Sequence, residues 1–379
     1  MKDVLLVGAG HAHVAVLRRF GLQPLPNTRL TLLTREAGTP YSGMLPGVVA
    51  GHYGVGEAHI DTVRLARFAG ARLCLGEAAG IDLAARRVLC RGGPPLPFDL
   101  LSLDIGSRPN TGSVPGAAAH AIPVKPIDGF LAQFAGVRAR IQTGQSRHVL
   151  LVGGGAGGVE LLLSVEHRLR RDADHAAALR FTLITGSDDI LPGFPQGFRA
   201  RFRAILARRG VAVRAGVQVA AVESGRVVLA DGSRIDADEI LWAAEAAPAS
   251  WLAGTGLPLD GYGFLNVDAT LRAADGVFAA GDTIAFPGTI PRSGVYAVRA
   301  GPVLADNIRA ALTGGRLRPY RPQADALAIV STGGRHAVLT RNGITLEGSW
   351  AWRLKDWIDR RFMARFNDLP HRTGPDSRS

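Results

Sequence analysis

The feature that most constrains the fold is a glycine turn that follows a short apolar run and occurs twice. Residues 4–7 form an apolar run that leads into Gly8 and Gly10 and then into a segment with helical periodicity. The second copy begins at residues 149–152 and continues through 153–158. A strand, a glycine turn and a helix in this order open the βαβ unit that binds dinucleotides. We therefore expect each turn to hold a diphosphate against a helix N-terminus, where free N–H groups favour an anion.

The two copies differ at the third glycine of the G-x-G-x-x-G pattern. Gly153, Gly155 and Gly158 complete it in the second copy, whereas His13 takes the third position in the first. That glycine normally lets the helix pack closely on its strand. We therefore expect the first helix to sit slightly off its strand, or its turn to differ. The alternative for both copies is a tight strand–helix turn that binds no ligand.

The order of the predicted elements indicates an α/β chain with two Rossmann-like dinucleotide-binding domains. The first glycines are 145 residues apart, about the length of one domain, and 379 residues can bury two or three cores. We expect one dinucleotide domain at 1–119 and 247–314, interrupted by a second at 120–246. A small C-terminal α+β region at 315–379 would form an interface and end in a disordered tail.

Composition excludes several classes of protein. The net charge of +12 favours anionic ligands or surfaces, but no nucleic-acid-binding signature accompanies it, so we expect no nucleic-acid partner. Cys74 and Cys90 lack the spacing of a redox pair. His11 and His13 have no third ligand nearby, so no metal is expected. Without a cleavable leader or a long apolar run, the predicted location is cytoplasmic.

Further residues suggest how dinucleotides would be bound. Glu36 is the acid that follows the second predicted strand and is assigned to a ribose. Asp188 and Asp189 follow the corresponding strand of the second unit without an arginine pair, which slightly favours NADH over NADPH. Asp282 follows Gly281 after an apolar strand, and its carboxylate is suited to a polyol such as ribityl. A simple turn is the alternative at 281–282.

The chain resembles the two-dinucleotide-domain flavoprotein disulfide reductase superfamily. Within it, the chain is similar to pyridine nucleotide-disulfide oxidoreductase-like proteins found alone or fused to selenide, water dikinase. The stretches that carry the resemblance are GAGHAHV at 8–14, TPYSGMLPG at 39–47, DIGSRP at 104–109, VGGGAGGVE at 152–160, VFAAGD at 277–282, PRSGVYAVRAGPVLADNI at 291–308 and KDWIDRRFMARF at 355–366. It covers nearly the whole chain.

The resemblance implies FAD at the first glycine turn and NAD(P)H at the second. Glu160 resembles a glutamate beside the nicotinamide, Lys125 a lysine near the flavin, and Tyr296 is a candidate for the acceptor site or the core. These three are the candidate catalytic residues. The FAD-binding residues would be Gly8, Gly10, His11, Ala12, His13, Glu36, Pro40, Tyr41, Ser42, Gly43, Gly106, Ser107, Arg108, Gly281, Asp282 and Val295. Those of NAD(P)H would be Gly153, Gly155 and Gly158.

Two departures from the superfamily shape the predicted function. The stretch at 39–47 lacks the cysteine pair that disulfide reductases place beside the flavin, so electrons would pass directly to an acceptor. This resembles type II NADH dehydrogenases, which reduce quinones, and predicts an FAD-dependent NAD(P)H:acceptor oxidoreductase. Glu245 stands where such chains usually carry glycine, and its carboxylate would weaken nicotinamide binding. The alternatives are a flavoenzyme of selenium or sulfur compounds and a flavin-binding sensor with an impaired nicotinamide site.

The C-terminal stretch at 350–366 has the pattern of an amphipathic helix. Leu354, Trp357, Ile358, Phe362 and Phe366 fall on one stripe, and basic residues occupy much of the remainder. Such a helix can lie on an anionic membrane surface, which would suit a quinone acceptor at the inner face of a membrane. It can equally pack on its own chain or on a second subunit in a homodimer.

Overall fold

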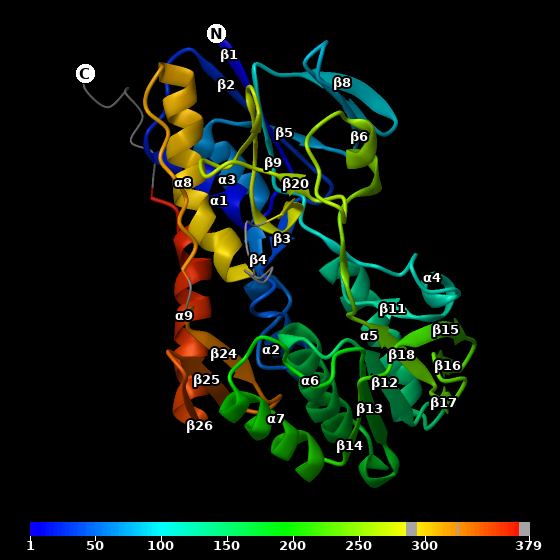
Figure 1. Cartoon of the computed structure of the whole chain (residues 1–379). Helices are drawn as coiled ribbons and strands as arrows, with labels where there is room; N and C mark the ends of the chain where they lie inside the picture. The colour runs from blue at the N-terminus through cyan, green and yellow to red at the C-terminus, as the bar shows by residue number, and fades with distance from the viewer. Residues whose placement is uncertain (286–293, 324–325, 371–379) are drawn as a thin grey trace.

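The computed structural model describes residues 1–285, 294–323 and 326–370. It is an α/β structure with two separate sheets of mainly parallel strands, so the predicted fold class is confirmed (Figure 1). The predicted domain boundaries stay a prediction, and the predicted disordered tail lies outside the described residues from position 371 onward.

The first sheet forms the core of the N-terminal half of the molecule. Its strand order is β21-β22-β9-β1-β2-β5, and only β21 is antiparallel to its neighbour. Helices α1 and α8 pack against each other beside it, and α3 packs on α1. The bounds are β1 Lys2–Val7, α1 His11–Leu22, β2 Thr28–Thr34, α3 Thr62–Ala69, β5 Arg72–Leu75, β9 Leu100–Leu103, β21 Arg272–Ala274, β22 Val277–Ala279 and α8 Gly294–Thr313.

Smaller elements surround this sheet. Strands β6, β7 and β8 form an antiparallel sheet, β3 pairs with β4, and β20 pairs with β23. Their bounds, with the short helix α2 and the turn η4, are β3 Gly38–Pro40, α2 Leu45–Ala50, β4 His59–Asp61, β6 Ala78–Asp82, β7 Arg87–Cys90, β8 Gly93–Pro97, β20 Leu265–Asn266, η4 Gly281–Thr283 and β23 Ile284–Ala285.

The second sheet is built from the middle of the chain. All its pairings are parallel, in the order β11-β18-β12-β13-β14, and an antiparallel sheet of β15, β16 and β17 lies beside it. The bounds are α4 Ala117–His120, β11 Ile122–Pro123, α5 Ile127–Gln142, β12 His148–Val152, α6 Ala156–Asp172, β13 Arg180–Thr185, α7 Gln196–Arg208, β14 Val211–Ala215, β15 Val219–Glu223, β16 Arg226–Leu229, β17 Arg234–Asp236 and β18 Glu239–Trp242. The antiparallel pair of β10 (Arg108–Pro109) and β19 (Ala246–Ala247) joins the two halves.

The register makes the two glycine turns directly comparable. In the first sheet Val7 of β1 pairs with Leu103 of β9, and the next residue is Asp104. In the second sheet Val152 of β12 pairs with Trp242 of β18, and the next residue is Ala243. The amide nitrogens of Asp104 and Ala243 donate to the carbonyl groups of Val7 and Val152 at 2.9 and 2.8 Å. Asp104 and Ala243 therefore occupy equivalent places beside the two turns.

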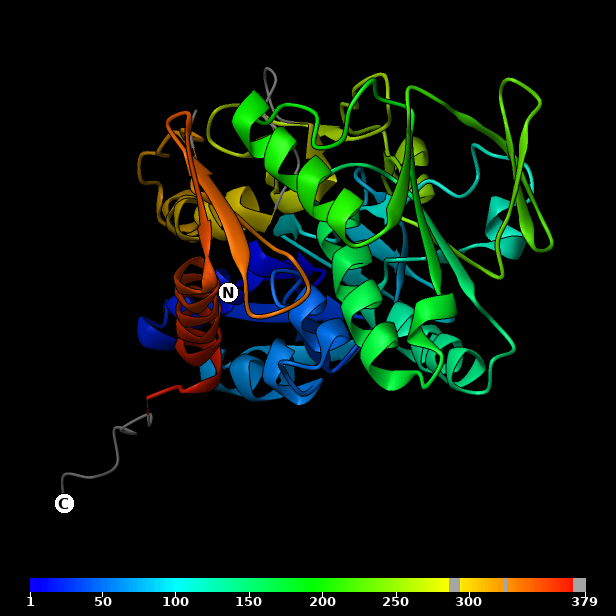
Figure 2. The same ribbon diagram turned by 90° about the horizontal axis from the view of Figure 1, so that it is seen from below.

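The C-terminal region connects both halves. Strands β24 (Ala328–Ser331), β25 (Ala337–Arg341) and β26 (Ile344–Gly348) form an antiparallel sheet that contacts α6 and α7. Helix α9 (Ser349–Asn367) follows and packs on this sheet, on β4 and on α1 and α3 (Figure 2). No helix in the described part of the chain is long and apolar enough to cross a bilayer.

The predicted apolar stripe on α9 divides between the protein body and solvent. Phe366 is buried, and Phe362 stacks on the ring of Tyr41 with centroids 4.3 Å apart. Trp357 is instead 56% exposed. The C-terminal part of the stripe, with Phe362 and Phe366, therefore closes a core of the same chain, and Trp357 lies on the surface.

Candidate functional site

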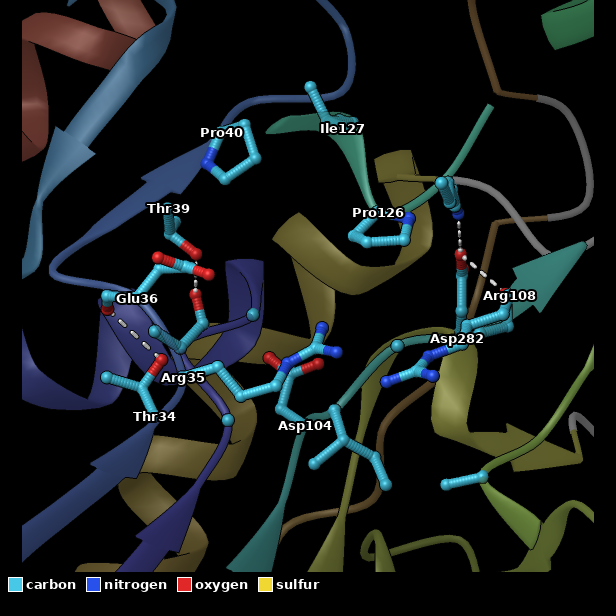
Figure 3. A pocket seen from close by; sticks show the side chains of 18 of the residues that line it. Thr34, Arg35, Glu36, Thr39, Pro40, Asp104, Arg108, Pro126, Ile127 and Asp282 are labelled. Carbon is cyan, nitrogen blue, oxygen red and sulfur yellow. Dashed lines mark hydrogen bonds and ion pairs between the residues drawn. The ribbon is translucent and has the colours of Figure 1, made fainter. Parts of the chain in front are cut away.

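A cavity of about 310 Å³ lies at the carboxyl edge of the first sheet (Figure 3). The ends of β1, β2, β5 and β9 line it, together with the loop before α5, the Asp282 turn and the start of α8. Ligands of open α/β sheets bind at this edge, where the strands end. The volume falls within the range of small-molecule pockets.

The first glycine turn forms one wall of this cavity. Gly8 has a φ of +88°, and a Cβ there would overlap the backbone of Asp104. A Cβ on Gly10 would overlap the carboxyl group of the same residue. Both glycines are therefore required by the close approach of Asp104, which also lines the cavity.

The side chain of His13 explains the missing third glycine. In the second turn, a Cβ on Gly158 would overlap the carbonyl group of Gly153. At the equivalent place in the first turn, His13 is fully buried, and its Nδ1 lies 2.6 Å from the carbonyl oxygen of Gly8. Its Nε2 lies 2.8 Å from the hydroxyl of Ser102 in β9. His13 thus links turn, helix and strand, and burial lowers its pKa to about 4.

A partly buried ion pair lies at the other end of the cavity. The ammonium group of Lys125 donates to Asp282 at 2.9 Å, and the hydroxyl of Ser107 donates to the same carboxylate at 3.4 Å. Burial alone would raise the pKa of Asp282, but Lys125 and the hydrogen bonds outweigh it and hold the pKa below its usual range. The ionised Asp282 can accept hydrogen bonds from a polyol, as expected for a ribityl chain.

The structure brings most of the predicted FAD-side residues together. Those that line the cavity are Gly8, Gly10, His11, Glu36, Pro40, Ser42, Gly106, Ser107, Arg108, Lys125 and Asp282. Those outside its lining are Ala12, His13, Tyr41, Gly43, Gly281, Val295 and Tyr296. Tyr296 is buried, and its hydroxyl donates to the carbonyl group of Gln323 at 3.3 Å, so its position favours the core interpretation. Val295 lies at the surface.

The second glycine turn leaves its helix N-terminus open. Cβ atoms on Gly153, Gly154 and Gly158 would overlap neighbouring atoms of the chain, whereas one on Gly155 would meet no atom within 4 Å. Gly155 caps α6 without a side-chain hydrogen bond. The exposed amide groups at this end of α6 are free to receive an anion such as a diphosphate.

Glu245 lies near this turn with a strained backbone. Its φ is +47°, in the left-handed region that favours glycine. Its carboxylate accepts hydrogen bonds at 3.4 Å from the side chains of Asn110 and Ser113. Asp189, one of the two acids considered for NADH preference, is instead paired with Arg199 and Arg203 of α7.

Glu160 belongs to a polar cluster between the two halves of the molecule. It accepts a hydrogen bond at 2.7 Å from the amide of Ser331 in β24. Lys355 of α9 donates to Asp359 at 2.8 Å and to the carbonyl group of Gly43 at 2.6 Å. The hydroxyl of Tyr41 hydrogen-bonds to Asp359.

Burial dominates the electrostatics of this cluster. Burial raises the pKa of Glu160, and Lys355 opposes the shift without cancelling it. The pKa of Asp359 is likewise raised by burial. The pKa of Lys355 is raised, because Glu160 and Asp359 together outweigh its desolvation. The cluster therefore places titratable groups with raised pKa values close to Pro40 and Ser42, which line the cavity.

Sequence reasoning missed Asp104, Ser102, Lys355 and Asp359. Lys355 and Asp359 are one helical turn apart, a spacing visible in the sequence, but their burial depends on contacts with residues more than 300 positions away. Asp104 was visible as an acid at the end of an apolar strand, which is an unusual residue in a parallel-sheet core.

Comparison with known proteins agrees with this architecture. Residues 2–301 match the model of the family described as pyridine nucleotide-disulphide oxidoreductase. An NADH dehydrogenase-like protein of Mycobacterium tuberculosis is 29% identical over 224 residues, which cover 57% of this chain and 56% of that protein. The chain thus matches little more than half the length of that relative.

Two further relatives cover more of the chain. The type II NADH:quinone oxidoreductase of Haemophilus influenzae is 24% identical over 337 residues, 75% of this chain and 74% of that protein. The crystal structure of the sulfide:quinone oxidoreductase from Aquifex aeolicus superimposes with a TM-score of 0.83 at 17% identity and covers 97% of this chain and 92% of that one. This likeness concerns the fold. Because the family model spans most of the sequence, the chain belongs to the pyridine nucleotide-disulphide oxidoreductase family.

Proposed function

We propose that this chain is an FAD-dependent NAD(P)H oxidoreductase that passes electrons to a quinone. The observation that carries the proposal is the position of the Glu160–Lys355–Asp359–Tyr41 cluster beside the cavity of the first glycine turn. Reduction of a quinone by NADH consumes one proton besides the hydride, so a proton-holding cluster next to the electron-transfer site suits this reaction.

The residues of the cavity fit FAD. Gly8 and Gly10 keep the turn beside α1 narrow, Glu36 lines the end near β2, and the Lys125–Asp282 pair lies at the end near α5. When bound, FAD would supply two-electron transfer between a nicotinamide and an acceptor. Asp282 would accept hydrogen bonds from its polyol, and Lys125 would keep that carboxylate ionised.

The open N-terminus of α6 supports NAD(P)H as the electron donor. Gly155 leaves space there, and the first amide groups of α6, which no described side chain caps, can donate to a diphosphate. Of the two acids that follow β13, Asp189 is paired with Arg199 and Arg203 of α7. Asp188 is therefore the acid that we assign to the ribose. We retain NADH as the expected donor because Asp188 is exposed beside that strand.

The buried cluster would supply protons to the acceptor. Glu160 and Asp359 have raised pKa values, so each can carry a proton closer to neutral pH than an exposed carboxyl group. Lys355 interacts electrostatically with both carboxyl groups and can stabilise whichever of them has lost its proton. General acids of this kind typically contribute about 10²–10⁴-fold to rate.

Anaerobic reduction tests the proposal. The purified protein should be yellow, lose its visible absorbance on addition of NADH, and regain it when a soluble quinone is added. Ferricyanide, selenite and a polysulfide would be tested in the same way, so that a one-electron acceptor or a selenium or sulfur compound is recognised. A yellow protein that keeps its absorbance with NADH and NADPH would contradict the oxidoreductase and favour a flavin-binding module.

A further inference from the structure

Asp104 occupies the position where the first glycine turn should receive an anion. Its Oδ2 accepts hydrogen bonds from the amide groups of Ala12 and His13 at 2.8 and 3.0 Å. These are donors in the first turn of α1, the same groups that attract phosphate in a dinucleotide-binding unit. The N-terminus of α1 is thus already capped by a carboxyl group that comes from the end of β9.

The second glycine turn of the same chain provides an internal comparison. Ala243 takes the place of Asp104 there, and Gly155 has open space in front of it where Gly10 faces a carboxyl group. In the described part of the chain no side chain accepts from the first amide groups of α6, whereas Asp104 accepts from those of Ala12 and His13 in α1. The carboxyl group is therefore an addition to the first turn and is not required by the strand–turn–helix fold.

The other oxygen of Asp104, Oδ1, lies between the first glycine turn and Gly281. Among the residues that the structure describes, no donor is hydrogen-bonded to Oδ1. A Cβ on Gly281, which has a φ of +70°, would overlap this oxygen. Asp104 lines the cavity and is almost fully buried. One oxygen thus caps the helix, and the other is left for a ligand.

Among the residues that the structure describes, no cation is paired with Asp104. Asp282 of η4 is the charged group that raises its pKa, and Lys125 is paired with Asp282. His13 and His11 of α1 both have their pKa lowered to about 4, so they are neutral at neutral pH. Burial, opposed by the amide groups of His13 and Ala12, raises the pKa of Asp104 to about 7.

We propose that Asp104 positions the diphosphate of FAD and that its carboxyl group takes up one proton when the cofactor binds. This inference rests on the proposed binding of FAD. An ionised Asp104 beside a diphosphate would place like charges together in a buried place. A protonated Asp104 can instead donate from Oδ1 to a phosphate oxygen while Oδ2 still accepts from α1. In this step the carboxylate of Asp104 takes up one proton from solvent and becomes a carboxylic acid in the complex.

The inference predicts how FAD retention depends on pH. Loss of the proton from the free protein favours release, so FAD should bind more weakly as pH rises through 7. With one linked proton, the dissociation constant should increase about tenfold between pH 6 and pH 8. Asp282 stays ionised over this range and the two histidines stay neutral, so these neighbours should not produce the change.

Release of FAD from the full-length holoprotein is the test. The protein would be diluted at pH 6, 7 and 8 and ultrafiltered, and flavin in the filtrate would be measured by fluorescence. Asp104→Asn keeps the shape and cannot ionise, so its dissociation constant should change less than twofold across this range. Asp99→Asn is the matched control, because Asp99 precedes the same strand at its opposite end and lies outside the cavity lining. This control should keep the wild-type tenfold change.

A second measurement uses the unmodified protein, so it does not require any variant to fold. Calorimetric titration of the FAD-depleted protein in two buffers of different ionisation enthalpy gives the number of protons taken up on binding. About one proton is expected near pH 8 and close to none at pH 5.5. If FAD binds with no proton uptake and with the same affinity at pH 6 and 8, the proposed role of Asp104 is overturned, but the proposed function is not. Absence of FAD binding at every pH would overturn the proposed function as well.

Discussion

Lys355 of α9 lies 2.8 Å from the carboxylate of Asp359, one helical turn further along. This pair is buried between the C-terminal helix and the loop that carries Tyr41 and Gly43. It connects a part of the chain beyond the residues of the family match to the loop whose Pro40 and Ser42 line the cavity. The C-terminal region therefore contributes to the candidate active site as well as to packing.

Replacement of Lys355 by Met should slow electron transfer to the acceptor more than reduction by NADH. The change leaves Asp359 and Glu160 without their cation, which raises their pKa further and makes them poorer proton donors. We expect quinone-dependent reoxidation to fall about 10²-fold. Stopped-flow absorbance would follow the two half-reactions separately.

Arg353→Met is the matched control, since Arg353 is an exposed cation on the same helix. It should leave both half-reactions within twofold of the unmodified protein. Equal slowing of both half-reactions in Lys355→Met would instead indicate a general distortion of the site.

The His13–Ser102 pair should make part of the stability depend on pH. The pKa of His13 is lowered to about 4, against 6.5 in an unfolded chain. Above pH 6.5 the ring is neutral in both states, and the contribution of the native pair is fully present. As pH falls below 6.5 the unfolded state binds the proton first, so stability is lost by about 1.4 kcal/mol per pH unit until pH 4.

Chemical denaturation of wild type and His13→Gln at pH 7 and pH 5 measures this effect. Glutamine cannot bind a proton, so the stability advantage of wild type over the variant should shrink by roughly 2 kcal/mol at pH 5. Ser102→Ala should destabilise by about 1–3 kcal/mol at pH 7, because it leaves a buried ring nitrogen unpaired. A difference between wild type and His13→Gln that is independent of pH would show that the ring is solvated.

The sequence predicted the fold because its strongest signals are local. Each glycine turn is specified by consecutive residues, and the strands that flank it read as continuous apolar runs, as expected for parallel strands buried on both faces. The glycine turn at 8–10 and Asp282 were predicted from such local patterns, and the family resemblance added Pro40, Ser42 and residues 106–108, all of which line one cavity. Residues 8–10, 106–108 and 282 come after β1, β9 and β22 of the first sheet, whose carboxyl ends share an edge.

The other features of the site could not be predicted from local sequence, because they depend on contacts between residues that are far apart in the chain. His13 replaces a glycine, and only its pairing with Ser102, 89 residues further on, shows how the turn accommodates it. The burial of Lys355 is created by a loop 312 residues earlier. Tyr296 follows the helix start expected to face a flavin, but the helical phase turns its ring into the core.

Glu245 should weaken NADH binding through its charge, and its strained backbone should lower the stability of the fold. Glu245→Gly removes the carboxylate and suits the left-handed backbone, whereas Glu245→Gln removes the charge alone. A carboxylate near a diphosphate costs on the order of 1 kcal/mol, so both variants should lower the Michaelis constant for NADH about fivefold. The glycine variant should also be more stable by roughly 1 kcal/mol because strain is relieved.

Steady-state kinetics and thermal denaturation separate the two effects. Glu223→Gln, which removes an exposed acid from the same half of the chain, should change neither quantity. An unchanged Michaelis constant in both Glu245 variants would mean that the hydrogen bonds to Asn110 and Ser113 already hold the carboxylate away from the ligand.

The C-terminal surface should bind anionic membranes. Four large apolar side chains are exposed on neighbouring elements: Ile344 (63%) and Leu346 (49%) on β26, and Trp350 (44%) and Trp357 (56%) on α9. The two tryptophans are seven residues apart and share a helix face with Arg353. The guanidinium of Arg361 lies 5.2 Å from the ring centroid of Trp357. Aromatic and basic side chains together suit the headgroup region of a bilayer.

Sedimentation with vesicles of neutral and anionic lipid tests this prediction. The protein should pellet with anionic vesicles at low salt and be released at high salt, because surface charges attract the lipid only over a short screened distance. Trp350→Ser combined with Trp357→Ser should reduce the pelleted fraction several-fold, since each exposed ring loses its apolar burial in the interface. Tyr262→Ser is the control, because Tyr262 is 82% exposed outside the C-terminal region. If the double variant leaves the protein in solution but converts a dimer to a monomer, the surface is a subunit contact.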